Sequence, residues 1–279
     1  MMKQAEAQQK MVIGLAQLNT GADKKDNIRS AIKAITDLSS RGAELIMLPE
    51  HADFIGPDEH KKAAAEEFEQ SAYLAELRSL ASKLACYIHV GSFLEKSEER
   101  IYNTAVVVNP AGEVVARYRK IHLFDVEIPG GKTYLESAVI SPGTETVRFS
   151  IGAFSFGLAT CYDLRFPELF RRQAAAGANV LLLPAAFTLQ TGRDHWEILL
   201  RARAIENQCW VAAAGQWGTA PPNHVCFGRS MVINPWGLVT AQAPDGISTI
   251  TAQLDLQTLG DIRTRFPALN HVRDDIFSI

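Results

Sequence analysis

The chain has 279 residues, of which 47% are hydrophobic and 21% are charged, and its formal net charge is -3. This composition is that of a globular protein with enough apolar material for a large core, and it offers no basic field for nucleic acid. No apolar run approaches the roughly 20 residues that cross a bilayer, so no membrane segment is expected.

Strands and helices alternate in the first part of the chain. The polar residues 1–10 are expected to be a frayed or disordered tail before a single domain over 11–279, since no linker, repeat or low-complexity run divides the rest. In chain order, the predicted elements are a strand at 11–18, a helix at 23–41, a strand at 44–49, a loop at 51–60, a helix over most of 63–84, and strands at 87–93, 101–109 and 113–119.

A long irregular segment follows at 120–143. It contains Pro129-Gly130-Gly131 and Pro142-Gly143, which interrupt regular structure. Loops of this length are usually functional or disordered, and the apolar residues in this one indicate that it is ordered.

The second part repeats the alternation of strands and helices. The predicted elements are strands at 147–151 and 154–160, a helix at 166–176, a strand at 179–185, a helix at 193–207, strands at 209–215, 225–234, 239–243 and 248–254, a short helix at 256–265 and an extended tail. Two similar halves predict an α/β fold in which two sheets pack together with helices outside, a four-layer αββα sandwich.

The stretch FSFGLATCYDLRFPELF, at 154–170, carries the clearest chemical signal. An apolar strand runs straight into Cys161, and Asp163 and Pro167 indicate the start of a helix, with Asp163 as its N-cap. A thiol at a strand-to-helix turn can point out of the sheet, where helix N–H groups favour the thiolate. A free cysteine is also a small core hydrophobe, and position alone leaves both interpretations open.

Two more charged residues follow apolar runs, Glu50 in LIMLPE and Lys120 in VVARYRK. Ligand sites collect at the carboxyl ends of parallel strands. A thiol that attacks a carbonyl carbon needs a base for its proton and positive charge for the oxyanion, and Glu50 and Lys120 could supply these. Each is also an ordinary solvated charge at a strand end, and spacing alone does not decide.

Three segments resemble motifs of the nitrilase, or carbon–nitrogen hydrolase, superfamily: LPE at 48–50, YRKIHLF at 118–124 and CYDLRFPE at 161–168. They occur in the family's order, and the resemblance covers about 11–277. It implies the αββα fold and a triad in which Glu50 is the general base, Lys120 stabilises charge and Cys161 is the nucleophile. It also implies a second glutamate, Glu136 in YLES, and a homodimer or larger homo-oligomer.

The residues after the cysteine are similar to the amidase branches, because nitrile-cleaving members typically have Cys-Trp-Glu where this chain has Cys161-Tyr162-Asp163. FDVEIPG at 124–130, HWEILLRARAIENQ at 195–208 and MVINPWG at 231–237 resemble the branch of omega-amidase and deaminated-glutathione amidase, which act on amides of 2-oxo acids. RARAIENQCW favours the second. Arg229 departs from the pattern, since close members usually carry His there.

The implied reaction is hydrolysis of a small carboxamide to carboxylate and ammonia through a cysteine thioester. The oxyanion is expected between Lys120 and the backbone N–H of Tyr162. Arg165 and Glu168 flank the turn and are expected to brace it as an ion pair. By the same resemblance, the segment after the strand at 179–185 lines the substrate pocket, and the expected substrate-binding residues there are Phe187, Thr188, Thr191 and Trp196.

Two alternatives stay open at this point. An N-carbamoyl hydrolase of the same superfamily would release carbon dioxide with the ammonia. A redox-sensing thiol protein built on Cys161 would need a resolving cysteine. The other cysteines, Cys86, Cys209 and Cys226, lie in apolar runs and are expected to be inert core thiols.

The four cysteines show no metal-ligand spacing and no C-x-x-C pair, which argues against a zinc site, a dithiol centre and a disulfide scaffold. Nothing in the sequence indicates a metal or another cofactor. Reduced thiols favour a cytoplasmic location. The expected partner is a small-molecule amide, with neither nucleic acid nor membrane.

Overall fold

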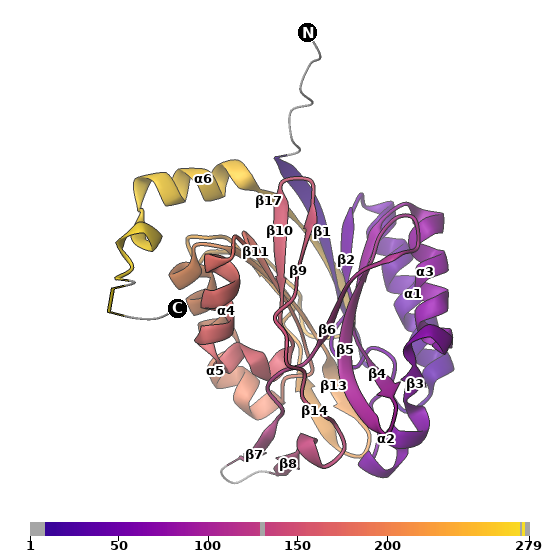
Figure 1. Cartoon of the computed structure of the whole chain (residues 1–279). Helices are drawn as coiled ribbons and strands as arrows, with labels where there is room; N and C mark the ends of the chain where they lie inside the picture. Colours follow the sequence, from indigo (N-terminus) through magenta and orange to yellow (C-terminus); the bar gives the residue numbers. More distant parts are fainter. Residues whose placement is uncertain (1–8, 129–131, 274, 277–279) are drawn as a thin grey trace.

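Two β-sheets packed face to face form the centre of the protein (Figure 1). This computed structural model describes residues 9–128, 132–273 and 275–276. Most of the predicted tail therefore lies outside the described residues, and so does Pro129-Gly130-Gly131. The first strand already begins at Lys10.

The first sheet has the strand order β17-β1-β2-β4-β5-β6, and β3 pairs with β4. Its centre, β1-β2-β4, is parallel, and its flanks are antiparallel. The strands are β1 (Lys10–Gln17), β2 (Leu45–Met47), β3 (Glu66–Glu67), β4 (Tyr87–Ser97), β5 (Arg100–Val108), β6 (Val114–Arg119) and β17 (Ser248–Asp255).

The second sheet has the order β16-β15-β12-β11-β10-β9, again with a parallel centre, β10-β11-β12. Its strands are β9 (Arg148–Ile151), β10 (Phe154–Leu158), β11 (Val180–Ala185), β12 (Trp210–Gly215), β15 (Met231–Ile233) and β16 (Val239–Gln242). Two small antiparallel hairpins stand apart from the sheets, β7 (Asp125–Glu127) with β8 (Thr133–Leu135) and β13 (Trp217–Ala220) with β14 (His224–Phe227).

Alternating side chains divide the core into layers. In β2, Leu45 and Met47 pack between the sheets, whereas Ile46 packs under the helices. The first sheet is covered by α1 (Lys24–Ser40) and α3 (Ala72–Leu84), and the second by α4 (Pro167–Ala175) and α5 (Leu189–Asn207). The predicted four-layer αββα sandwich is confirmed. None of the described helices has the length and apolar character needed to cross a membrane.

Both hairpins and the short helix α2 (Asp58–Ala64) gather at one end of the sandwich, the lower end in Figure 1. The parallel strands β1 and β2 point their carboxyl ends this way. The remaining elements are α6 (Leu256–Arg265) and the 3₁₀-helices η1 (Phe68–Gln70), η2 (Glu136–Ala138), η3 (Cys161–Arg165) and η4 (Ala268–His271). The predicted irregular segment 120–143 thus holds a hairpin and a 3₁₀-helix.

The predicted helix over most of 63–84 is confirmed at 72–84, which is α3, but is wrong at 65–71. The helix before this gap, α2, ends at Ala64 and begins at Asp58, inside the predicted loop at 51–60. Between α2 and α3, the Glu66 carboxylate binds Lys24 and accepts a hydrogen bond from the Ser71 hydroxyl, and Ser71 caps α3. These long-range contacts hold the segment extended beside β4, and helical spacing cannot reveal them.

The predicted strand at 225–234 is two strands, β14 and β15. Gly228 (φ 74°) and Arg229 (φ 57°) lie between them in the left-handed region, where extended backbone cannot continue. This turn separates β14, which pairs with β13 at the end of the sandwich where the hairpins gather, from β15, which pairs with β12 in the second sheet.

Candidate active site

Glu50 follows β2 in a turn that is pinned to β4. The N–H of His51 donates to the Ser92 hydroxyl at 2.7 Å, and the N–H of Ala52 donates to the Ser92 carbonyl at 3.1 Å. His51 has φ 54°, an uncommon conformation for a non-glycine residue. Gly91 permits this close approach, because a Cβ there would overlap the carbonyl oxygens of Leu48 and Pro49. The turn thereby buries the Glu50 carboxylate inside the end of the sandwich.

Cys161 follows β10 and begins the 3₁₀-helix η3, with φ 48°. Such a conformation costs on the order of 1–3 kcal/mol in a non-glycine residue and persists only where its surroundings impose it. The prediction that Asp163 caps the following helix is wrong. Asp163 instead bonds back to the N–H of Thr160 at 2.8 Å, and α4 begins later, with Pro167 as its first residue.

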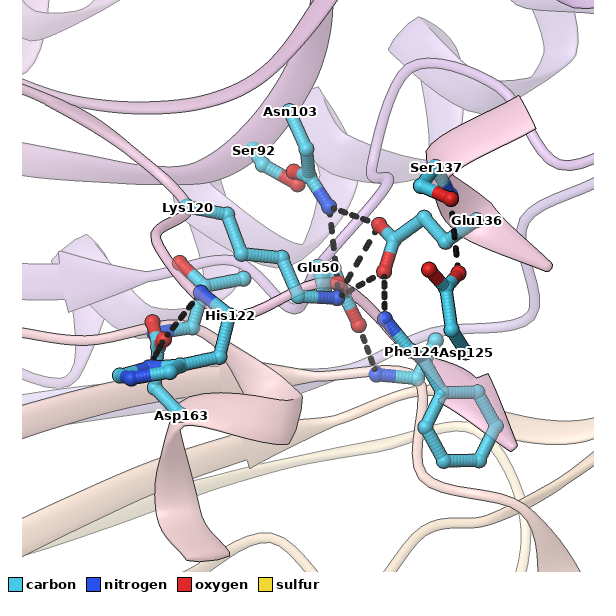
Figure 2. A network of polar contacts seen from close by, with 12 residues as sticks. Glu50, Ser92, Asn103, Lys120, His122, Phe124, Asp125, Glu136, Ser137 and Asp163 are labelled. Atoms are coloured by element: carbon cyan, nitrogen blue, oxygen red, sulfur yellow. Dashed lines mark hydrogen bonds and ion pairs between the residues drawn. The ribbon is translucent and has the colours of Figure 1, made fainter. Parts of the chain in front are cut away.

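Asp163 ties the cysteine turn to the segment that carries Lys120. One carboxylate oxygen accepts from the Tyr118 hydroxyl at 2.6 Å. The other accepts from the His122 N–H at 3.0 Å and contacts the His122 ring at 2.7 Å (Figure 2). The His122 ring stacks on Phe166 with centroids 3.7 Å apart. A fully buried carboxylate thus fixes η3, next to the second sheet, against the end of β6 in the first.

Lys120 lies between two carboxylates. Its ammonium Nζ is 3.0 Å from Glu50 Oε1 and 2.8 Å from Glu136 Oε2, as Figure 2 shows. Glu50 Oε2 accepts from the Ala186 N–H at 2.7 Å, and Glu136 Oε2 accepts from the Phe124 N–H at 2.7 Å. Each carboxylate is therefore held by a charge and by the backbone of a different segment.

A cavity of about 450 Å³ opens over these groups and is also lined by Cys161. The exposed fractions of Glu50, Lys120 and Cys161 are 1%, 2% and 8%, so these three side chains are almost fully buried. Aromatic side chains, among them Phe124, Tyr134, Tyr162 and Phe187, form part of the wall, and charged ones such as Lys61 and Lys132 form another part. A volume of this size suits a small organic molecule.

Burial and the charges of neighbouring groups together set the charge states of Glu50, Lys120 and Cys161. Burial would raise the pKa of Glu50, but its neighbours, the Lys120 ammonium foremost, outweigh burial and lower this pKa. Burial would lower the pKa of Lys120, but Glu136 and Glu50 raise it well above its usual value. Burial and the Glu50 charge raise the pKa of the Cys161 thiol. At neutral pH the site holds a carboxylate, an ammonium and a neutral thiol.

Ligand atoms of Glu50, His51 and Glu136 lie within 4.8 Å of one another, a spacing that a metal ion could bridge. The Lys120 ammonium already lies within hydrogen-bonding distance of both carboxylates. A second cation there would face direct repulsion, so the donor set fits the ammonium better than a metal.

A family model described as carbon-nitrogen hydrolase matches residues 12–264. The chain belongs to the carbon–nitrogen hydrolase family. It is 39% identical to the deaminated glutathione amidase of Bos taurus, over 95% of this chain and 83% of that protein. It is 35% identical to the omega-amidase NIT2 of Homo sapiens, over 96% of both chains. The crystal structure of the C. elegans NitFhit protein superimposes with a TM-score of 0.89 at 36% identity, over 98% of this chain and 67% of that one.

The hydrolase brings Glu50, Lys120, Glu136 and Cys161 together around one cavity, as the sequence predicted for their positions. Tyr162 also lines this cavity, as the second residue of η3. Its N–H belongs to the first turn, where N–H groups have no partner within the helix.

Of the tentative pocket residues, Phe187, Thr188 and Thr191 line the cavity. Trp196 does not: it is fully buried in the core, packs on Phe187 and donates from its indole N–H to the Arg229 carbonyl at 2.8 Å. The Arg229 side chain pairs with Asp245 at 2.9 Å and is absent from the described lining of the cavity.

The ion pair expected between Arg165 and Glu168 is not formed among the described side chains. The Arg165 guanidinium contacts His195 Nδ1 at 3.2 Å and lies over the rings of Tyr162 and Phe187, 5.9 and 5.2 Å from their centroids. Arg165 therefore packs against the cavity wall, a cation–π arrangement that its position in sequence did not indicate.

Several residues of the site were missed in the sequence. His224 and Tyr134 line the cavity from the two hairpins, and no local pattern marks either. Asn103 contacts both carboxylates that flank Lys120, those of Glu50 and Glu136. Its one available signal was an amide within the apolar run of β5, IYNTAVVV.

Proposed function

We propose that this hydrolase cleaves a small carboxamide to a carboxylate and ammonia through a thioester on Cys161. The observation that carries the proposal is the convergence of a thiol, a buried carboxylate and a buried ammonium on one cavity. The membership in the carbon–nitrogen hydrolase family and the amidase names of its relatives support it.

In the first half of the reaction, the Cys161 sulfur attacks the amide carbon while its proton passes to Glu50. The pKa values oppose ionisation of the free thiol, so the proton moves as the new C–S bond forms. The oxyanion rests between the Lys120 ammonium and the Tyr162 N–H. The intermediate collapses, the nitrogen takes the proton from Glu50, and ammonia leaves a thioester behind.

In the second half, a water molecule attacks the thioester carbon and gives a proton to Glu50. The C–S bond breaks, the thiol recovers its proton, and the carboxylic acid departs. Glu136 keeps Lys120 charged and oriented through both steps, since its carboxylate contacts the ammonium with both oxygens, at 3.1 and 2.8 Å.

The proposed substrate is an amide of a 2-oxo acid, of the deaminated glutathione or 2-oxoglutaramate type. The names of relatives in cow and human support this class. The cavity volume accommodates a molecule of that size, and the aromatic side chains in its wall suit the aliphatic part of the substrate.

The test is ammonia release from purified protein with deaminated glutathione, 2-oxoglutaramate, carbamoylputrescine and a simple nitrile. We expect turnover of a 2-oxo-acid amide without carbon dioxide, and none in Cys161→Ala. The thioester should be trapped at Cys161 by acid quench and mass spectrometry. Full turnover by folded Cys161→Ala would end the proposal, and carbon dioxide release would favour the N-carbamoyl alternative.

We also propose that the hydrolase forms a homodimer and works in the cytoplasm. Four exposed apolar side chains, together called the apolar patch, support the dimer: Ile198 and Ile205 of α5, Trp236, whose neighbour Gly237 lies against Ile205, and Phe266. Trp236 packs edge-on against Phe266, with centroids 5.8 Å apart. Large exposed apolar surfaces mark interaction sites. Four unpaired cysteines support a reducing compartment.

A further inference from the structure

Asn103 is fully buried in β5, behind the triad. Its amide nitrogen donates to Glu50 Oε1 at 2.8 Å and lies 3.5 Å from Glu136 Oε1 and 3.4 Å from His51 Nε2. Its backbone carbonyl accepts from the Lys120 N–H at 2.9 Å. One residue therefore contacts both carboxylates and the backbone that carries the ammonium, as Figure 2 shows for the side chains.

The orientation of this amide is fixed by charge. Turning it over would bring its oxygen against two carboxylates, so the nitrogen must face them. The amide oxygen, Asn103 Oδ1, then lacks a hydrogen-bond partner among the described residues, although it is buried. Burying an unpaired carbonyl oxygen is unfavourable for folding. The amide is thus oriented to donate to the carboxylates, and this orientation leaves its own oxygen unpaired.

Asn103 is absent from the described lining of the cavity, whereas the groups it contacts, Glu50, His51 and Glu136, all lie on that lining. A substrate in the cavity would not touch the amide. We propose that Asn103 is a positioning residue of the reaction: its amide holds the Glu50 carboxylate in place between Lys120 and Cys161 and keeps Glu136 on the opposite side of the ammonium.

The chemical reason is that Glu50 must receive and return a proton in each half of the reaction. The carboxylate contacts Lys120 and Asn103 with Oε1, while Oε2 takes the Ala186 N–H. Without the amide, the carboxylate could rotate toward Lys120 and lose its alignment with the thiol. Catalysis is sensitive to displacements of this size.

This inference rests on the proposed amide hydrolysis. The experiment compares the wild type with Asn103→Leu, which keeps the bulk without the donors, and Asn103→Ser, which covers the case in which Leu does not fold. Thr104→Val is the matched control, since Thr104 is the next residue of β5, is equally buried, and donates to Glu95 instead, at 2.7 Å. Values of kcat are normalised to folded sites, that is, to the concentration of folded protein measured by near-ultraviolet circular dichroism.

We expect kcat per site to fall about 10–100-fold in the Asn103 variants, the usual cost of losing a supporting hydrogen bond, with KM changed less than about threefold. Thr104→Val should keep the wild-type kcat per site. Unchanged kcat per site in a folded Asn103 variant would overturn the inference, and so would an equal loss in Thr104→Val. A folded wild type that hydrolyses no amide would instead refute the proposed function.

Discussion

The residues of the active site balance one buried ammonium against two carboxylates. Lys120 contacts both Glu50 and Glu136, so one ammonium and two carboxylates together carry a net negative charge at a buried position. A developing oxyanion would add to that charge, and the ammonium is the group that can stabilise it. The donors around the carboxylates, the Ala186 and Phe124 N–H groups and the Asn103 amide, stabilise the remaining negative charge.

Replacing Lys120 with alanine should lower kcat by about 10²–10³-fold, because loss of one oxyanion donor costs about 2.7–4 kcal/mol in comparable sites. The variant also leaves two buried carboxylates without their cation, so its free energy of unfolding should fall. Kinetics and urea unfolding measure the two effects. A variant with full activity would show that the oxyanion does not depend on this ammonium.

The pH dependence of kcat/KM should reflect the lowered pKa of Glu50. A base with a lowered pKa stays ionised as the pH falls, so kcat/KM should remain level from neutral pH down through about 4, the usual glutamate pKa. Activity is then lost only as the pH falls through the lowered value. Rates measured promptly after a pH jump, with recovery checked at neutral pH, separate titration from unfolding. A reversible half-loss near pH 6 would contradict the expected charge state.

The positions of Glu50, Lys120 and Cys161 could be predicted because each ends an apolar strand and lies in a recognisable motif. The position of Asn103 could not, because a buried amide in a strand shows no spacing that identifies its partners. The role of Asp163 was misassigned for a similar reason. Its short-range pattern matches a helix cap, whereas its observed partners Tyr118 and His122 lie more than forty residues away.

At the scale of elements, the fold was predictable where periodicity is strong. The parallel strands β1, β10 and β11 and the helix α1, with its Asp23 cap, lie close to the expected residues. The predicted boundaries of elements were wrong where long-range contacts determine the end of an element, between α2 and α3 and at Gly228–Arg229. Both failures involve segments at the end of the sandwich that holds the site, where chain direction is set by contacts rather than by local propensity.

Gly91→Ala should disturb the element that carries Glu50. The added Cβ would overlap the carbonyl oxygens of Leu48 and Pro49, so β4 and the end of β2 must separate. We expect a lower melting temperature and a loss of kcat that exceeds the loss of folded protein.

Gly260→Ala is the control for this substitution, since a Cβ at this position in α6 meets no atom within 4 Å. It should be neutral or stabilise the protein by up to about 1 kcal/mol, because alanine favours a helix. Normal activity and stability in Gly91→Ala would show that the two strand ends can part without moving the carboxylate.

At the scale of the whole molecule, the exposed apolar patch on α5 and its neighbours makes the proposed homodimer testable. Ile205→Glu places a charge in the patch and should shift a dimer toward monomer in sedimentation velocity. Val115→Glu in β6 of the other sheet is the control, because Val115 is also exposed, at 43%, but lies outside the patch. A wild type that is monomeric at all concentrations would refute the dimer, and an equal effect of both variants would refute the role of the patch.

The proposed catalytic groups are divided between the two sheets: Glu50 and Lys120 follow β2 and β6 of one, and Cys161 follows β10 of the other. Neither sheet carries all three groups, so turnover requires the two sheets to be packed together. During refolding, far-ultraviolet circular dichroism should recover before turnover does, since secondary structure can form before the sheets meet. The recovery of turnover therefore measures how fast the two sheets pack together in the last stage of folding.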